Sequence, residues 1–184
     1  MKKIGLFFGS FNPIHVGHLA IAEYMLQTLS LDSILFIVSP QNPFKSLKDL
    51  WSEHKRFMLV QKAVEYNSKF IASDIEFKLP KPSYTFLTLE KLKQRYPQAK
   101  FYIIIGSDNL TRLMEWKQID EILQQHSIEI YQRPGTENLT SLHPNIHIHS
   151  TPMLSVSSTE IRNLLAAGKS VKGLMPESIL HLLQ

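Results

Sequence analysis

The sequence predicts an α/β protein in which helices cover both faces of a doubly wound, mostly parallel sheet. Short apolar runs alternate along the chain with longer segments of helical periodicity, which is the order of βαβ units. Two of these runs end in a glycine followed by polar residues and a helical pattern, at Gly9 and at Gly106. The chain of 184 residues contains no repeat, low-complexity tract or linker, so we expect one Rossmann-like domain spanning residues 1–184.

The composition narrows the class of protein. Hydrophobic residues make up 43% of the chain and charged residues 20%, as in ordinary globular proteins. The absence of cysteine excludes disulfides, thiolate chemistry and cysteine-ligated metal sites. A net charge of +4 is compatible with a small polyanionic substrate and does not indicate nucleic acid. No apolar run is long enough for a signal peptide or a membrane span, so we expect a cytoplasmic protein without a membrane or nucleic-acid partner. A homo-oligomer stays open.

The first half of the chain predicts a βαβ unit, then a helix, two short strands and another helix. The unit consists of strand 3–8, helix 17–29 and strand 33–38. The later elements are helix 53–66, strands 70–72 and 75–77, and a helix that begins within residues 83–88 and ends near Arg95. In helix 53–66 the expected inward side chains are Phe57, Met58, Val60 and Val64.

The second half predicts two further apolar strands, each followed by a polar turn. Strand 101–105 leads through Gly106 into a helix that ends near Glu115, with Leu113 and Met114 in the core. Strand 127–131 leads into a loop over residues 135–145. A strand containing His147 and His149 follows, and then a C-terminal helical segment over residues 157–184 with a last short helix from near Pro176.

The junction between the first strand and the first helix has the composition of an anion site. A helix N-terminus presents unpaired N–H groups and the positive end of its dipole, so it attracts a phosphate. Gly9 and Gly17 permit a close approach to the backbone, and His15 and His18 add hydrogen-bond donors there. Singly, these are equally well turn glycines and capping or surface histidines. Together they predict a nucleotide-phosphate site.

A second polar segment near the C-terminus has the same character. Ser157 and Glu160 fit a capping box, which predicts a helix start. Ser158, Thr159 and Arg162 would then share one face of the first turns. A cation in the first turn opposes the helix dipole unless an anion lies between it and the N–H groups. The alternative is an ordinary capped helix with a solvated arginine.

Four other places allow both a structural and a ligand-binding interpretation. Lys45 lies beyond the second strand, where a lysine is usually solvated but could reach the phosphate region. Ser83 or Thr85 fits an N-cap of the helix that follows. Asp108 fits a helix cap after the strand, and Trp116 lies between two helical segments, where packing is the usual role.

The nucleotidylyltransferase superfamily has a T/HxGH motif, which residues 9–18 resemble: Gly9-Ser10-Phe11-Asn12-Pro13-Ile14-His15-Val16-Gly17-His18. The nearest resemblance is to the bacterial nicotinate-nucleotide adenylyltransferases. It extends in order over residues 4–19, 40–45, 83–89, 103–116, 131–135 and 154–162. The chain departs from the usual family pattern at Ser10 and Asn12, where Thr and Asp are common, at Phe44, where His is common, and at Leu87, where Asp is common.

The resemblance implies adenylyl transfer from ATP to nicotinate mononucleotide, giving deamido-NAD and pyrophosphate. It implies that His15 and His18 are catalytic donors to the phosphates. The implied ATP-binding residues are Gly9, Ser10, Phe11, Lys45, Gly106, Asp108, Arg133, Ser157, Ser158, Thr159 and Arg162. The implied mononucleotide-binding residues are Asn12, Lys45, Tyr84, Thr85 and Trp116. We expect Mg²⁺ to bind through the substrate phosphates and water, because no carboxylate cage is evident and no protein metal ligand is expected.

Two other functions stay open. One is a sibling transferase that uses nicotinamide mononucleotide or phosphopantetheine, and the other is a non-catalytic nucleotide- or RNA-binding domain. A metal site at His143, His147 and His149 is disfavoured, because no carboxylate or cysteine lies near them in the sequence.

Overall fold

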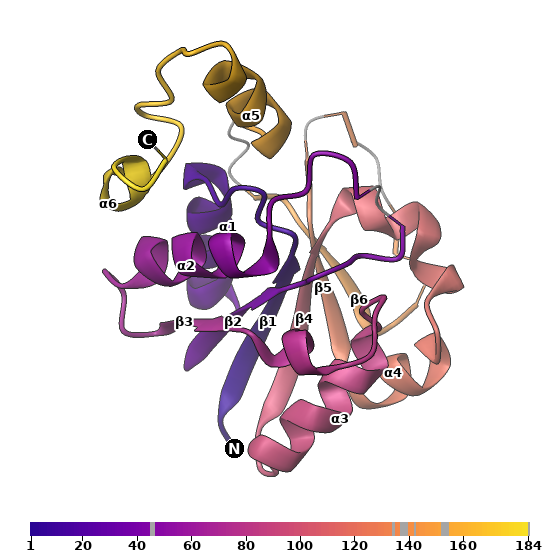
Figure 1. Ribbon diagram of the computed structural model, residues 1–184. Coiled ribbons are helices and arrows are strands. Elements are labelled where there is room, and N and C mark those ends of the chain that lie inside the picture. The colour runs from indigo at the N-terminus through magenta and orange to yellow at the C-terminus, as the bar shows by residue number, and fades with distance from the viewer. Residues whose placement is uncertain (45–46, 134, 137–139, 142, 152–154, 184) are drawn as a thin grey trace.

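The computed structural model describes residues 1–44, 47–133, 135–136, 140–141, 143–151 and 155–183 (Figure 1). Its centre is a sheet of six strands in the order β3-β2-β1-β4-β5-β6, and each strand pairs in parallel with its neighbours. The strands are β1 (Lys3–Gly9), β2 (Ser33–Val38), β3 (Phe70–Ser73), β4 (Lys100–Gly106), β5 (Ser127–Tyr131) and β6 (Ile146–His149). The prediction of a doubly wound sheet is confirmed, and the parallel pairing is complete.

Helices cover both faces of the sheet. One face packs against α1 (Val16–Thr28), α2 (Glu53–Val64), α5 (Ser158–Ala166) and α6 (Glu177–Leu180). The other packs against α3 (Thr85–Arg95), the 3₁₀ helix η2 (Ser107–Glu115) and α4 (Ile119–Gln125). Because β1 is buried on both faces it needs no polar alternation: Leu6 points to the second face and Phe7 to the first.

The strand order reverses between β1 and β4, which lie side by side although β2 and β3 separate them in sequence. In open α/β sheets a ligand crevice forms outside the carboxyl ends of the strands at this switch point. Gly9 and Gly106 end these two strands. Figure 1 shows α5 beyond the same edge of the sheet, beside the start of α1.

Some expectations about local structure were wrong, and others are confirmed. Residues 75–77 lie in a 3₁₀ helix, η1 (Ile75–Lys78), which lets Ile75 and Phe77 pack against different cores while Glu76 turns inward. The helix predicted to end near Glu115 is confirmed, and it has 3₁₀ geometry. Met58 and Met114 are 43% and 54% exposed, because other side chains of their helices fill the core. The last short helix is confirmed: Pro176 is the N-cap residue of α6, which spans Glu177–Leu180.

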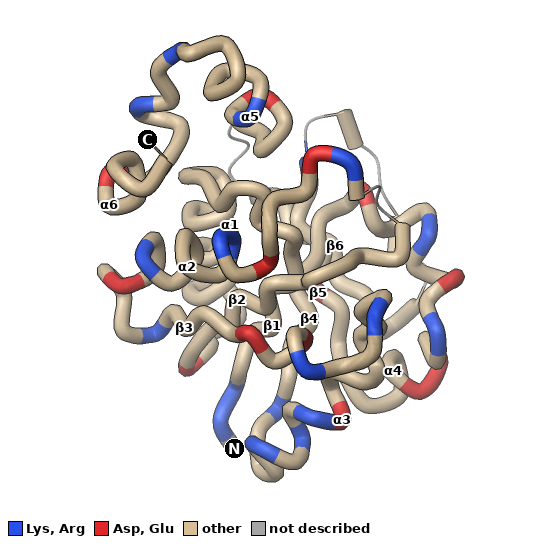
Figure 2. Tube along the Cα trace, viewed as in Figure 1, with Lys and Arg blue, Asp and Glu red and all other residues tan. Residues whose placement is uncertain are grey.

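Acidic and basic residues are interspersed along the trace (Figure 2). A group of basic residues lies near the N-terminus and α3, at the opposite end of the sheet from α5. No helix in the described part of the chain is long and apolar enough to cross a membrane.

Candidate active site

Two adjoining cavities open at the carboxyl edge of the sheet. We call the first the aromatic pocket; it is lined by Phe8, Gly9, Ser10, Ser39, Asn42, Pro43, Phe44, Glu76, Ser83, Tyr84, Thr85, Ile105, Asn109, Glu115, Trp116 and Lys117. We call the second the basic cleft; it contains the end of β1, the start of α1, the ends of β4 and β5, and residues 155–160 and 162. Phe8, Gly9, Ser10, Asn42 and Asn109 line both cavities, so a ligand that bridges them would lie across the end of β1.

The loop after β1 is fixed by close packing. A Cβ on Gly9 would lie 2.8 Å from the ring of Phe11, so only glycine fits there. Phe11 has φ of 45°, in the left-handed region, and its buried ring packs against Phe7 and Phe36. This anchor holds the backbone of Ser10 and Asn12 at the wall of the basic cleft.

His15 and His18 lie together at the start of α1. Their rings stack with centroids 3.7 Å apart, and His15 is the N-cap residue. The His15 backbone N–H donates to His18 Nδ1 at 3.2 Å, so the ring proton of His18 is on Nε2. Both side chains line the basic cleft, and each is less than 8% exposed. The sequence motif therefore brings two imidazoles into one buried wall.

The electrostatic environment of His15 favours its neutral form. Burial, and to a smaller extent the charge of Arg133, lower the pKa of His15 from 6.5 to about 4. At neutral pH the ring is therefore an uncharged hydrogen-bonding group. Its Nδ1 is buried without a partner and lies next to Gly17, where a Cβ would approach it to 3.0 Å.

The C-terminal signature closes on the same loop. Ser157 caps α5 by accepting a hydrogen bond from the Glu160 N–H at 3.1 Å, as its sequence predicts. Ser158 Oγ donates to the carbonyl of Pro13 at 2.9 Å, and Arg162 Nη1 donates to the carbonyl of Asn12 at 2.8 Å. These bonds join segments 145 and 150 residues apart and place α5 against the start of the cleft.

Asn12 has a defined structural role. Its Nδ2 donates to the carbonyl of Asp49 at 2.9 Å, and its Oδ1 accepts from the Trp51 N–H at 3.0 Å. The side chain thus ties the loop after β1 to residues 49–51. An aspartate could not make the first of these bonds, because it has no N–H group.

The opposite wall of the basic cleft is formed by the ends of β4 and β5. Gly106 and Asp108 follow β4, and Arg133 follows β5. Arg133 Nη1 lies 3.3 Å from Asp108 Oδ2. Asp108 is not the cap of η2, because Gly106 occupies that position without a side-chain bond. The Arg133 side chain is 41% exposed, and its guanidinium places a positive charge in the basic cleft.

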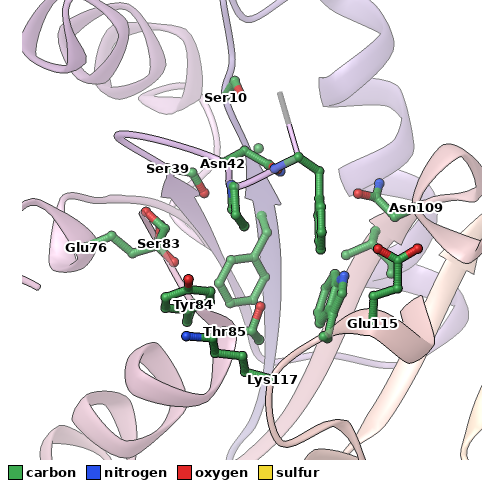
Figure 3. A pocket seen from close by; sticks show the side chains of 16 residues that line it. Ser10, Ser39, Asn42, Glu76, Ser83, Tyr84, Thr85, Asn109, Glu115 and Lys117 are labelled. Carbon is green, nitrogen blue, oxygen red and sulfur yellow. The ribbon is translucent and has the colours of Figure 1, made fainter. Parts of the chain in front are cut away.

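The aromatic pocket lies between the start of α3 and the segment after η2 (Figure 3). Tyr84 is the N-cap residue of α3 and makes no side-chain capping bond, so neither Ser83 nor Thr85 is the cap that the sequence predicts. The first N–H groups of α3 are consequently without a side-chain cap at the edge of the pocket. Trp116 ends η2 and forms part of the pocket wall.

Arg56 is the most important residue that the sequence interpretation missed. It is fully buried in α2 and donates to four carbonyls: those of Ser10, Ser39, Pro40 and Trp51. It thereby holds the loops after β1 and β2 together. Its spacing of three and four residues from Leu59 and Val60 places it on the buried face of the helix.

Glu76 is a second residue that was missed. It is 2% exposed, and Thr88 Oγ1 donates to its Oε1 at 2.7 Å. Its Oε2 and the hydroxyl of Ser83 are buried without hydrogen-bond partners beside the aromatic pocket. Burial raises the pKa of Glu76, and nearby hydroxyls, above all that of Thr88, partly offset this. The group is thus biased towards its neutral form.

All the implied site residues that the structure describes line one of the two cavities. Lys45 lies outside the described residues. His147 and His149 lie on β6, and His149 Nε2 is 2.7 Å from Glu129 Oε2, so a carboxylate does lie near them across the sheet. No group of three or more His, Cys, Asp or Glu within the described ranges could hold a metal ion.

Known proteins resemble this chain over nearly its whole length. A model of the cytidylyltransferase-like family matches residues 6–164. A probable nicotinate-nucleotide adenylyltransferase of Cytophaga hutchinsonii is 48% identical over 182 residues, which cover 98% of this chain and 95% of the relative. One of Bacteroides fragilis is 47% identical over 171 residues, which cover 92% of this chain and 85% of the relative.

A solved structure supports the fold. Plasmodium falciparum nicotinic acid mononucleotide adenylyltransferase, complexed with NaAD, aligns with a TM-score of 0.81 at 21% identity and covers 99% of this chain and 96% of its own. On the sequence relatives, this chain belongs to the nicotinate-nucleotide adenylyltransferase family, within the cytidylyltransferase-like nucleotidyltransferases.

Proposed function

We propose that this protein transfers the adenylyl group of ATP to nicotinate mononucleotide, a step of NAD biosynthesis. The observation that supports this most directly is the junction of two unlike cavities across the end of β1. The basic cleft has histidines, arginines and helix N-termini suited to phosphates. The aromatic pocket has Trp116 and Tyr84, which suit a flat ring. A mononucleotide with its ring in one and its phosphate in the other would meet ATP at the boundary.

The reaction needs positioning and charge stabilisation rather than a covalent nucleophile. A 5′-phosphate oxygen of the mononucleotide attacks the α-phosphorus of ATP and forms a new P–O bond. The bond from the α-phosphorus to the oxygen that bridges it to the β-phosphorus breaks, and that oxygen leaves with pyrophosphate. Negative charge grows on the oxygens around the α- and β-phosphorus atoms, so hydrogen-bond donors fixed there before the reaction lower the barrier.

His18 is suited to be such a donor. Its Nδ1 accepts a hydrogen bond from the backbone N–H of His15, so its ring proton is on Nε2, and its side chain lines the basic cleft. His15 would act beside it as a neutral group, because its pKa is about 4. Preorganised donors of this kind contribute about 3–4 kcal/mol each in other enzymes. Arg133, Arg162 and the start of α5 would hold the charged leaving group.

The residues present fit a magnesium ion that binds with the nucleotide rather than one held by the protein. Asp108 is paired with Arg133, and the described residues form no multidentate acidic group. We propose that Mg²⁺ is held by phosphate oxygens and water. When bound, it would neutralise part of the phosphate charge.

The test is pyrophosphate release from ATP in the presence of each candidate acceptor. We expect turnover with nicotinate mononucleotide, less with nicotinamide mononucleotide and none with phosphopantetheine. Turnover with phosphopantetheine in place of the pyridine nucleotides would assign a sibling reaction. Tight RNA binding without pyrophosphate release from any mixture would instead support a non-catalytic binding domain.

A further inference from the structure

The charged side chains around the aromatic pocket differ in whether they form ion pairs. Of the described residues that line it, only Lys117 is cationic. Glu115 is engaged by Arg112, whose Nη2 lies 2.7 Å from Glu115 Oε2. Glu76 is buried, and that burial favours its neutral form. The pocket is therefore left with one cation that no described carboxylate neutralises.

The position of Lys117 is set by the chain around it. It follows Trp116, whose N–H bonds back to the carbonyl of Leu113 at the end of η2. The next residue, Gln118, has φ of 56° and is the N-cap residue of α4. The ammonium group reaches across the pocket to the start of α3, where it lies 4.0 Å from the centroid of the Tyr84 ring. Figure 3 shows its amine beside Tyr84.

This contact leaves the ammonium group available for a ligand. An exposed cation over a tyrosine ring is held weakly, and the ring accepts no hydrogen bond as strong as that of a carboxylate. The ammonium carries three donors and lies over the ring of Tyr84, the N-cap residue of α3, whose first N–H groups have no side-chain cap. An anionic substituent on a ring in this pocket would meet both the charge and the helix end, whereas a neutral substituent would meet only dipoles.

We propose that the Lys117 side chain is a specificity-determining residue, whose ammonium binds an anionic substituent on the acceptor's ring and disfavours a neutral amide in its place. This inference rests on the proposed function, since it presumes that the ring of a pyridine mononucleotide occupies the aromatic pocket. It concerns recognition of the acceptor, and it assigns Lys117 no part in the transfer of the adenylyl group.

The experiment compares Lys117→Met with Lys117→Arg and with the wild type, using nicotinate and nicotinamide mononucleotides in separate assays. In Lys117→Met we expect the KM for the nicotinate form to rise about tenfold, the change that follows from losing one charge-assisted hydrogen bond. Its kcat, the KM for ATP and the KM for the nicotinamide form should stay within about twofold. Lys117→Arg should recover most of the selectivity, because it restores the positive charge.

Lys100→Met is the matched control. Lys100 also lies over a tyrosine, 5.3 Å from the Tyr102 ring centroid, but it starts β4 at the other edge of the sheet. The Lys100→Met substitution should leave the KM values for both acceptors unchanged. Equal changes for the two acceptors in Lys117→Met, or no change in either, would overturn the role of Lys117 while leaving the proposed function intact. Failure of the proposed function would show earlier, as an inactive wild type with both acceptors.

Discussion

The basic cleft and the aromatic pocket are built in different ways although they share the end of β1. The cleft depends on two compact signatures, and each folds into one loop and one helix start. Its two histidines are positioned by a short-range bond, from the His15 N–H to His18, and the second signature is joined to the first by the bonds of Ser158 and Arg162. The pocket takes its walls from five separate segments, within residues 8–10, 39–44, 76, 83–85 and 105–117, and its buried Glu76 joins η1 to α3 through Thr88.

This difference means that the adenylyl transfer is assigned to the basic cleft and the choice of acceptor to the aromatic pocket. Changes in the cleft should alter turnover with every acceptor alike, because the phosphates are common to all of them. Changes in the pocket should alter the choice of acceptor at nearly constant turnover. A third class should affect both, because Arg56 holds the loops of Ser10 and Ser39 that line the two cavities.

The largest effect is expected from Arg56→Met. It removes two buried and two part-buried bonds to backbone carbonyls and should lower the free energy of unfolding by about 3–5 kcal/mol, as loss of a buried charged partner does. Urea unfolding measures this loss of stability. Under conditions in which Arg56→Met remains folded, steady-state kinetics should show a higher KM for both ATP and the acceptor. Lys62→Met removes a surface pair of the same helix and should cost under about 1 kcal/mol. A rise in only one of the two KM values would contradict the shared role of Arg56.

His18→Ala tests the cleft by itself. We expect kcat to fall by about 10²–10³ with either pyridine mononucleotide, because a preorganised donor to the developing charge is lost. The ratio of the two acceptors' kcat/KM values should not change. His181→Ala, at an exposed histidine outside both cavities, is the control. A fall in kcat with only one acceptor would mean that His18 selects the acceptor rather than stabilising the charge that develops in the transfer.

The pH dependence of stability tests the burial of His15. Its pKa of about 4 in the folded state lies below the usual 6.5, so between these values the unfolded chain binds the extra proton. Stability is unaffected above pH 6.5 and falls as the pH decreases towards 4. Between pH 7 and pH 5 this contribution is about 2 kcal/mol. Urea unfolding at the two pH values should show a smaller fall in His15→Gln than in the wild type. Equal falls would mean that His15 is solvated and titrates normally.

The parts that sequence predicted well are those whose information is local. β1, β2, β4 and β5 are continuous apolar runs that only a sheet covered on both faces can bury. The start of α5 was predicted because Ser157 and Glu160 are three residues apart and need no distant partner. Likewise, the histidines of the cleft lie within one turn of each other.

The parts that sequence missed depend on distant partners. Arg56 stands among polar residues of α2, where an arginine is usually solvated, and its four acceptors are supplied by loops that begin in other elements. Ile75 and Phe77 alternate as in a strand, but the burial of Glu76 against Thr88 favours a tight turn. The importance of Asn12 appears only when residues 49–51 lie against it.

The smallest effect is expected from Asn12→Asp, which replaces the side-chain amide by a carboxylate. The carboxylate keeps the bond from the Trp51 N–H but faces the Asp49 carbonyl without a donor, which should cost about 1 kcal/mol. Thermal unfolding should show a decrease of a few degrees. Asn145→Asp breaks a similar bond, from Nδ2 to the Leu123 carbonyl at 2.8 Å, outside both cavities. If Asn12 acts only by fixing its loop, Asn12→Asp should raise the KM for ATP slightly and leave acceptor preference unchanged, whereas Asn145→Asp should change neither. A changed acceptor preference would show instead that Asn12 takes part in selecting the acceptor, as the residues of the aromatic pocket are proposed to do.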